Sequence, residues 1–137
     1  MNAPETQALC VDAACSGNPG PMEYRGVLLP SGKELFHFGP IQGTNNIGEF
    51  LAVVHALALL SQRGSAMTIY TDSTTALTWV RKGKAKTLLA RTPQTETAYR
   101  LVARAERWLH THVWTNRIEK WDTDNWGEIP ADYGRKG

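Results

Sequence analysis

Four acidic residues, each in its own segment of the chain, stand in contexts that suit a metal site. They are Asp12 in ALCVDAACSGNPG, Glu49 in GTNNIGEFLAVVHAL, Asp72 in MTIYTDSTTALTWV and Asp132 in WGEIPADYGRKG. If the fold brings them together, their carboxylates form a pocket of hard oxygen ligands for divalent cations. Such a pocket supports phosphodiester hydrolysis, so these four residues define the first hypothesis about function.

Asp12 is the acid that most requires a partner. Residues 8–14 alternate as a β-strand, with positions 9, 11 and 13 on one face and positions 10, 12 and 14 on the other. A carboxylate between Val11 and Ala13 in a strand is costly to bury unless another group compensates its charge. Glu49 has a simpler explanation, because we place it in the first turn of a helix, where the helix dipole favours an anion.

The elements that must position these acids follow in the order βββαβααβ. Strands are expected over 22–29 and 33–39, and the turn Pro30-Ser31-Gly32 between them makes the first three strands an antiparallel meander. A helix should run to about Gln62 after the N-cap candidates Thr44, Asn45 and Asn46, and Ser73 can cap the helix that follows a short strand over 67–70. A second long helix should start at Thr92-Pro93, before a last strand over 113–121.

This order predicts an α/β fold with one mixed sheet. Three antiparallel strands are followed by two parallel additions, which gives five strands with helices packed on the faces of the sheet. The length of 137 residues predicts a single domain over 1–137, with residues 1–7 and 137 flexible. Trp79 and Trp108 are expected in the core, while Trp121 and Trp126 should anchor the tail that carries Asp132.

Composition points to a cytoplasmic protein that does not enter a membrane. The longest apolar run, residues 50–60, is too short to span a bilayer, and residues 1–7 lack the features of a secretory signal. Cys10 and Cys15 lie roughly 16 Å apart along one strand, too far for a disulfide, which needs Cα atoms within about 7 Å. Two free thiols fit a reducing compartment.

Five basic residues lie within eleven positions that contain no acid: Arg81, Lys82, Lys84, Lys86 and Arg91. Clustering of this kind is typical of a surface that binds a polyanion. The same residues also suit a solvated helix end beside Gly83, because cations near a helix C-terminus are favoured. Taken alone, this second interpretation is slightly the better one.

Five motifs occur in a recognisable order. Asp12 begins D-x-x-x-x-x-N-P-G, the strand segment MEYRGV follows, Thr44-Asn45-Asn46 precede Glu49, Asp72-Ser73 follow a strand, and WGEIPADYGRK closes the chain. Together they resemble type 1 ribonuclease H over residues 8–136. The resemblance is close to the catalytic domain of bacterial members with a WGE-x-x-ADYGRK tail, as in alkaliphilic bacilli. Any one motif is weak, whereas five at compatible spacing are specific.

The resemblance implies an endonuclease that hydrolyses the RNA strand of an RNA–DNA hybrid and leaves 5′-phosphate and 3′-hydroxyl ends. It implies two Mg²⁺ ions, with Mn²⁺ able to substitute, and a monomer without an obligate protein partner. The implied ligands are Asp12, Glu49, Asp72 and Asp132. Glu128 would approach a metal and help the product leave. Two divalent ions bring four positive charges into one pocket, which explains why several carboxylates are needed.

The resemblance also implies contacts to the substrate. Discrimination of RNA from DNA requires groups that bind the 2′-hydroxyl, and the implied groups are Gly17, Asn18, Asn45 and Asn46. Thr44 would contact a phosphate of the DNA strand, and Ser73 and Lys136 would make further contacts. Each also has a local explanation, because Asn18 suits an Asn-Pro-Gly turn, Asn45 and Asn46 suit an N-cap, and Lys136 suits a frayed terminus.

Several alternatives remain open from the residues alone. Asp122 and Asp124 lie in the same loop as Asp132 and compete with it for the fourth ligand position. The loop histidine of many family members is missing, and the four histidines present are expected to be structural or exposed. Two other functions are a nuclease of this fold that acts on DNA and a module that binds hybrid with little or no turnover.

Overall fold

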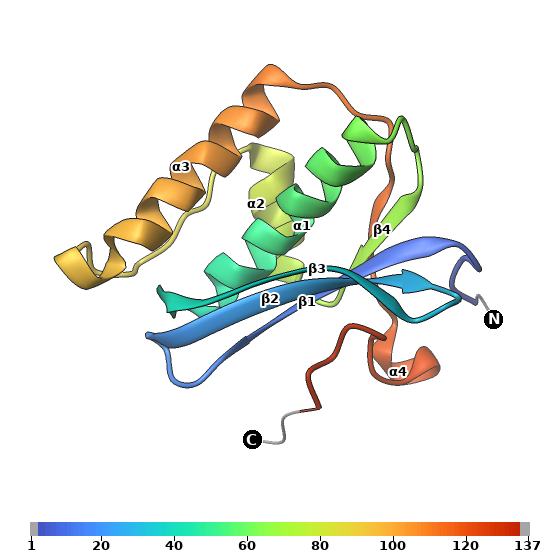
Figure 1. Cartoon of the computed structure of the whole chain (residues 1–137), viewed down its shortest axis with the longest axis horizontal. Coiled ribbons are helices and arrows are strands. Elements are labelled where there is room, and N and C mark those ends of the chain that lie inside the picture. The colour runs from blue at the N-terminus through green and yellow to red at the C-terminus, as the bar shows by residue number, and fades with distance from the viewer. Residues whose placement is uncertain (1–2, 135–137) are drawn as a thin grey trace.

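A computed structural model of the chain describes residues 3–134 and confirms the α/β prediction (Figure 1). The sheet has five strands in the order β3-β2-β1-β4-β5, namely β1 Ala8–Cys15, β2 Gly20–Leu29, β3 Lys33–Gly43, β4 Thr68–Thr71 and β5 Ile118–Lys120. The helices are α1 Asn45–Gln62, α2 Thr74–Lys82, α3 Glu96–Thr111 and α4 Thr123–Trp126, with a 3₁₀ turn at Pro93–Thr95.

The two faces of the sheet are covered differently. Helices α1, α2 and α3 lie on one face, and α4 with the C-terminal segment lies on the other (Figure 1). The main core joins Leu9 and Val11 of β1 to residues of the three helices, whereas Cys10 of β1 packs with Ile129 and Ala131 of the tail. The predicted alternation of β1 is therefore confirmed, and it places Asp12 on the face that the tail covers.

An interruption in strand pairing creates the space for a site beside β1. Antiparallel pairing with β2 runs the full length of β1, from the pair Ala8–Leu29 to the pair Cys15–Met22. Parallel pairing with β4 stops at the pair Cys10–Tyr70. The second half of β1 thus has no strand on its β4 side, and the chain that leaves β4 turns away through Asp72 at this point.

Helix α1 begins where the sequence predicts and is buried on nearly all sides. Thr44 is its N-cap, with an extended backbone and a side chain that accepts a hydrogen bond from the N–H of Ile47 at 3.2 Å. The helix ends at Gln62, as expected. Its first turn contains no acid, so the placement of Glu49 in that turn is wrong, and the helix dipole explains this carboxylate poorly.

Two predicted elements differ in part from the structure, each for a local reason. Thr92 is an N-cap followed by Pro93, as expected, but the first turn is a 3₁₀ turn and α3 begins at Glu96. The hydroxyl of Thr95 donates to the carbonyl of Ala90 while it accepts from the N–H of Thr92. The strand expected over 113–121 is paired only at Ile118–Lys120. Before it, the buried amide of Asn116 donates to the carbonyls of Ser65 and Met67, and this replaces a strand ladder.

Within residues 3–134, no helix combines the length and the apolar character needed to cross a bilayer. Cys10 is buried, Cys15 is partly exposed and both are free thiols, as the spacing predicts. Trp79 belongs to the core, and Trp108 packs against it.

The close approach of α1 to the sheet depends on Gly48. A Cβ placed on this residue would lie 2.9 Å from the Cβ of Ala13 and 2.9 Å from the Sδ of Met22, closer than side chains tolerate. Glycine inside a helix lowers stability by about 1 kcal/mol relative to alanine. If there were free space beside Gly48, the substitution Gly48→Ala would therefore be stabilising.

We expect Gly48→Ala to lower the free energy of unfolding by about 1–3 kcal/mol, because overpacking outweighs the gain in helix propensity. Urea unfolding measures the change, with Ser61→Ala at the exposed end of α1 as a control that should stay within about 0.5 kcal/mol of the parent. A more stable Gly48→Ala variant would show that the contact is not tight.

Candidate metal centre

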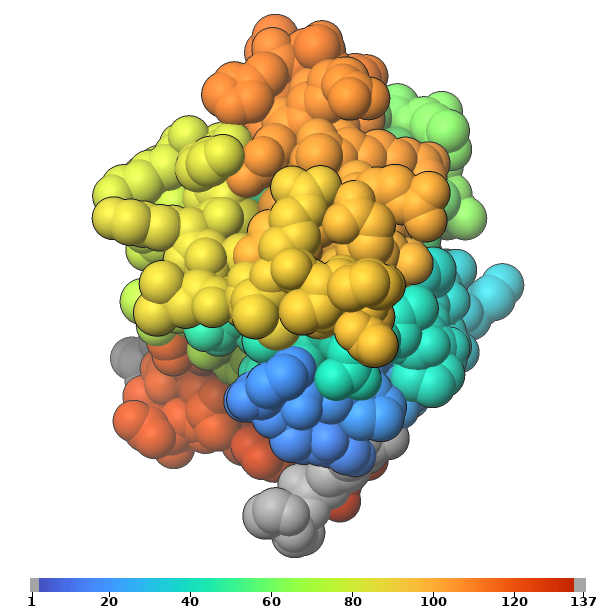
Figure 2. Space-filling view, turned by 90° about the vertical axis from the view of Figure 1, so that its left-hand side faces the viewer, coloured from blue at the N-terminus to red at the C-terminus, as the bar shows by residue number. Residues whose placement is uncertain are grey.

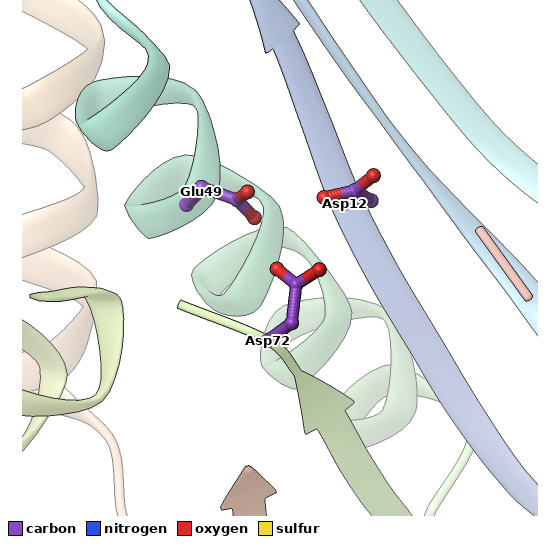
Figure 3. Close-up of side chains that lie close together, drawn as sticks. All are labelled: Asp12, Glu49 and Asp72. Atoms are coloured by element: carbon purple, nitrogen blue, oxygen red, sulfur yellow. The ribbon is translucent and has the colours of Figure 1, made fainter. Parts of the chain in front are cut away.

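Three of the four predicted acids meet at the interrupted edge of β1. Asp12 projects from β1, Glu49 from α1 and Asp72 from the residue after β4 (Figure 3). One carboxylate oxygen of each residue lies within 4.8 Å of the corresponding oxygens of the other two. Asp12 is 6% exposed and Glu49 is 4% exposed, so two of these charged groups are almost removed from water.

The acids in this cluster hold protons more tightly than ordinary carboxylates do. Burial raises the pKa of Asp12 to about 7, with a further contribution from the negative charge of Asp72. Burial raises the pKa of Glu49 well above its usual range, and the charge of Asp12 adds to this effect. The pKa of Asp72 is also raised, again chiefly by burial, although Lys120 acts in the opposite direction. Full ionisation of the cluster therefore requires a compensating positive charge.

The oxygen atoms of the cluster fit a hard divalent cation. Oxygen Oε1 of Glu49 is buried and has no hydrogen-bond partner in the described part of the chain, which is unfavourable unless a cation binds it. All three donors are carboxylates, the ligand type that Mg²⁺, Mn²⁺ and Ca²⁺ prefer, and no thiol or imidazole is among them. A divalent cation would satisfy the orphaned oxygen and offset the repulsion between the three acids.

Asp132 lies at the border of the cluster and is not one of the three acids whose oxygens meet within 4.8 Å. It is half-buried, and its charge contributes to the raised pKa of both Asp12 and Asp72. Its Oδ2 accepts a hydrogen bond from the N–H of Gly134 at 2.8 Å, and its own N–H donates to the carbonyl of Ile129 at 2.8 Å. Glu128 is exposed, and its charge also raises the pKa of Asp72.

The two competing acids of the tail have other positions. Asp122 is the N-cap of α4, where Oδ1 accepts from the N–H of Asn125 at 3.3 Å and Oδ2 from its side-chain amide at 2.7 Å. Asp124 is exposed within α4. Trp121 anchors this segment as expected, since it is 4% exposed and its Nε1 donates to the carbonyl of Gly127 at 2.8 Å. Of these three acids, Asp132 is the one whose charge contributes to the raised pKa of both Asp12 and Asp72.

Most of the residues expected to contact a substrate lie in two segments, the loop after β1 and the start of α1. Oxygen Oδ1 of Asn18 accepts a hydrogen bond from the N–H of Asn45 at 2.9 Å, which joins the loop after β1 to the start of α1. Gly17 has a positive φ of 97°, and Asn46 is exposed. Figure 2 shows this loop and the start of α1 side by side on one face of the molecule.

The local explanations of Thr44 and Ser73 are also realised. Both are N-caps, and the Ser73 hydroxyl accepts from the N–H of Ala76 at 3.0 Å. Lys136 lies outside the described residues.

The four histidines take structural or surface positions, as expected. His55 is hydrogen-bonded to the Tyr24 hydroxyl at 2.9 Å, and His110 lies 3.0 Å from the carbonyl of Gly83. His37 bonds to Glu23, and His112 stacks on Trp108.

Two residues near the acids were not identified from the sequence. Lys120 pairs with Thr71 across β5 and β4, one position before Asp72, and lowers the pKa of that acid. Arg25 pairs with Asp12 across β2 and β1 and binds the tail. Each of these two residues lies in a strand that neighbours a strand leading to or carrying an acid. This relationship can be recognised only once the strand register is known.

The raised pKa of Asp12 predicts how stability depends on pH when no metal is bound. A carboxyl group with an unfolded pKa near 4 and a folded pKa of about 7 stabilises the fold when protonated, and this contribution is lost as the pH rises from about 4 through 7. We expect the unfolding free energy in EDTA to fall by on the order of a few kcal/mol between pH 5 and pH 8.

The change should be smaller in Asp12→Asn, which should also be more stable than the parent at pH 8. Urea unfolding at several pH values measures both effects, with Asp124→Asn as a control for loss of one exposed acid. An Asp12→Asn variant with the same pH profile as the parent would contradict the prediction.

Comparisons with known proteins point to one family. The family model for RNase H matches residues 4–128. A ribonuclease H of Paracidovorax citrulli is 51% identical over 75 residues, which cover 53% of this chain and 46% of that protein. A ribonuclease H of Neorickettsia sennetsu is 39% identical over 72 residues, which cover 51% of this chain and 48% of that protein. The chain thus spans about half the length of the curated relatives it matches.

A solved structure supports the same fold. The RNase H1 of the halophilic archaeon Halobacterium salinarum superposes with a TM-score of 0.53 at 23% identity and covers 84% of both chains. The family match includes Asp12, Glu49 and Asp72 and ends at residue 128, so the position of Asp132 rests on the structure of the tail. Because the family model matches most of the chain, including the three acids that meet at the edge of β1, the chain belongs to the RNase H family.

Proposed function

We propose that the chain is a metal-dependent endonuclease of the type 1 ribonuclease H class that cuts the RNA strand of RNA–DNA hybrids. The observation that carries this proposal is the buried cluster of Asp12, Glu49 and Asp72, whose oxygens converge and which leaves Oε1 of Glu49 without a hydrogen-bond partner in the described chain. Family membership supports the choice of a hybrid over other phosphodiesters.

In this proposal Asp12, Glu49 and Asp72 hold divalent cations, and Asp132 completes the ligand set from the tail. When bound, the cations supply Lewis-acid activation of water and stabilise charge on the oxygens of the phosphate. Two ions fit the number of acids better than one, and Mg²⁺ is the proposed metal, with Mn²⁺ able to substitute. Cleavage would leave 5′-phosphate and 3′-hydroxyl ends.

Glu128 has a separate proposed role. It is exposed, and its charge acts on Asp72, so it lies close enough to influence how tightly a cation is held. We propose that it helps the product leave, as the resemblance to members with the WGE tail implies.

The substrate would lie across the face shown in Figure 2. Gly17, Asn18, Asn45 and Asn46 are proposed to contact 2′-hydroxyl groups, and the Asn18–Asn45 hydrogen bond keeps the two segments in register. Thr44 and Ser73 use their hydroxyls as caps. The proposed phosphate contact of Thr44 and the proposed substrate contact of Ser73 would therefore come chiefly from the adjoining backbone N–H groups.

The basic segment after α2 adjoins this face. Figure 2 shows it above the loop after β1 and the start of α1. Lys84 pairs with Glu106 at 3.8 Å, and Arg91 pairs with Glu96 at 3.0 Å, while Lys86 is exposed. The segment supports binding of a polyanion, with its charge reduced by these two ion pairs. We further propose that the chain is one domain that acts as a monomer in the cytoplasm. The free cysteines support only the last part of this proposal, because they fit a reducing compartment.

Cleavage by Asp12→Asn tests the proposal. We expect the parent to cut only the RNA strand of a labelled hybrid in Mg²⁺ and to be inactive in EDTA. Since loss of a group that merely supports a metal ligand costs roughly 10–100-fold, loss of the ligand itself should reduce cleavage by more than about 100-fold.

Matched RNA–RNA and DNA–DNA duplexes, together with Asp124→Asn, serve as controls. Full cleavage by Asp12→Asn would refute the proposed site. Cleavage of duplex DNA would favour a DNA-acting nuclease of the same fold, and tight hybrid binding without cleavage would favour a binding module.

Asn46→Ala tests the contact to RNA. Asn46 is exposed at the start of α1, so we expect little change in unfolding free energy. The loss of one hydrogen bond to substrate, worth about 1 kcal/mol net, should lower kcat/KM for the hybrid about fivefold. An unchanged kcat/KM would remove Asn46 from the substrate surface.

A further inference from the structure

Arg25 of β2 binds the backbone of the C-terminal tail with two hydrogen bonds. Its Nε donates to the carbonyl of Ala131 at 2.8 Å, and its Nη2 donates to the carbonyl of Asp132 at 2.6 Å. The planar guanidinium is suited to this contact because it presents several N–H donors in a rigid fork. Two bonds from one rigid group fix both the position and the orientation of the bound segment.

The location of Arg25 connects the tail to the acid cluster. Arg25 is the register partner of Asp12 in the β1–β2 pair. Residues directly opposite each other in an antiparallel pair project from the same face, with Cβ atoms about 5 Å apart. The side chain that holds the tail is therefore the immediate cross-strand neighbour of the most constrained acid in the site.

Other contacts hold the same segment, and the guanidinium has two further neighbours. Ile129 is 2% exposed and Ala131 is fully buried against β1, so the tail is packed as well as hydrogen-bonded. The Arg25 guanidinium lies over the ring of Tyr133, with its central carbon 4.8 Å from the ring centroid. It also pairs with Glu34 of β3 at 3.6 Å.

The contact is made to the backbone of Asp132. Within residues 3–134, no ion pair joins Arg25 to the carboxylate of this residue. Residues 127–134 form no regular strand or helix, so tertiary contacts must place the tail. A backbone clamp positions the Asp132 side chain without pairing its charge, which leaves that charge to act on the cluster.

We propose that Arg25 is a positioning residue that clamps Ala131 and Asp132 across the β1–β2 pair and so sets the distance of the Asp132 carboxylate from Asp12 and Asp72. The inference rests on the proposed function, in which Asp132 completes the metal ligands. Arg25 itself touches neither the cations nor the substrate in this account.

A double-mutant cycle between Arg25→Ala and Asp132→Asn tests the proposal. Arg25→Ala should raise the Mg²⁺ concentration for half-maximal hybrid cleavage roughly tenfold, as loss of groups that orient metal ligands does, and should weaken Ca²⁺ binding measured by calorimetry by a similar factor. In the Asp132→Asn background, Arg25→Ala should have almost no further effect on either quantity, because Arg25 acts through Asp132.

A readout without metal or substrate tests the clamp itself. The N–H of Gly134 donates to Asp132 Oδ2, and the N–H of Asp132 donates to the carbonyl of Ile129. Loss of the clamp should accelerate amide exchange at these two positions in metal-free Arg25→Ala, while amides of α1 should stay protected. Arg25→Lys keeps the charge but offers a single donor group, so it should recover only part of the parent's Mg²⁺ affinity and protection.

Two controls separate the clamp from general effects of charge. Arg117→Ala removes another arginine that pairs with Glu5 and Glu119, and Glu34→Gln removes the ion-pair partner of Arg25. Both should behave as the parent does.

The proposal is overturned if Arg25→Ala leaves Mg²⁺ dependence and amide exchange unchanged. It is equally overturned if Arg25→Ala weakens metal binding as much in the Asp132→Asn background as in the parent. If the parent neither cleaves hybrid nor binds Ca²⁺, the proposed function fails and the metal-positioning role of Arg25 fails with it, whatever the amide exchange shows.

Discussion

The mutual repulsion of three carboxylates in a nearly dry site is the constraint on which the structure around β1 depends. Asp12, Glu49 and Asp72 are held within reach of one another by three elements that cannot move apart without disrupting the main core. Burial and proximity raise the pKa of each acid, so in the absence of a cation the site opposes its own ionisation. A site of this kind is expected where a bound ligand supplies the compensating positive charge as part of function. A purely structural ion pair would instead include a positively charged side chain.

The surrounding fold provides the rigidity that this arrangement requires. The β1–β4 pairing stops at Tyr70, which opens space beside Asp12, and the close packing of Gly48 lets α1 bring Glu49 into that space. Asn18 ties the loop after β1 to the first residue of α1. The acids and the proposed substrate surface are therefore positioned by the same segments, so a shift of α1 would disturb metal binding and substrate contact together.

Much of this could be predicted from the sequence, and the failures have physical causes. The alternation of β1, the Thr44 cap and the end of α1 follow from local patterns. The predicted strands over 8–14 and 67–70 were enough to place Asp12 within β1 and Asp72 after β4. The last strand is shorter than its pattern suggests because Asn116 binds backbone carbonyls in place of a strand neighbour. Glu49 was assigned to the first turn because three caps, Thr44, Asn45 and Asn46, were compatible with the sequence, and the structure uses the first of them. Arg25 was missed because its importance depends on strand register and on a tail 106 positions away, neither of which a local pattern contains.

The division of the acids between an early and a late part of the chain means that two different cores hold them. Three of them lie within the first 72 residues, on elements that pack together in the main core. Asp132 belongs to a tail that packs on the opposite face of the sheet, in the smaller core that contains Ile129 and Ala131. The proposed ligand set is therefore divided between two hydrophobic cores, and it is complete only when both are packed.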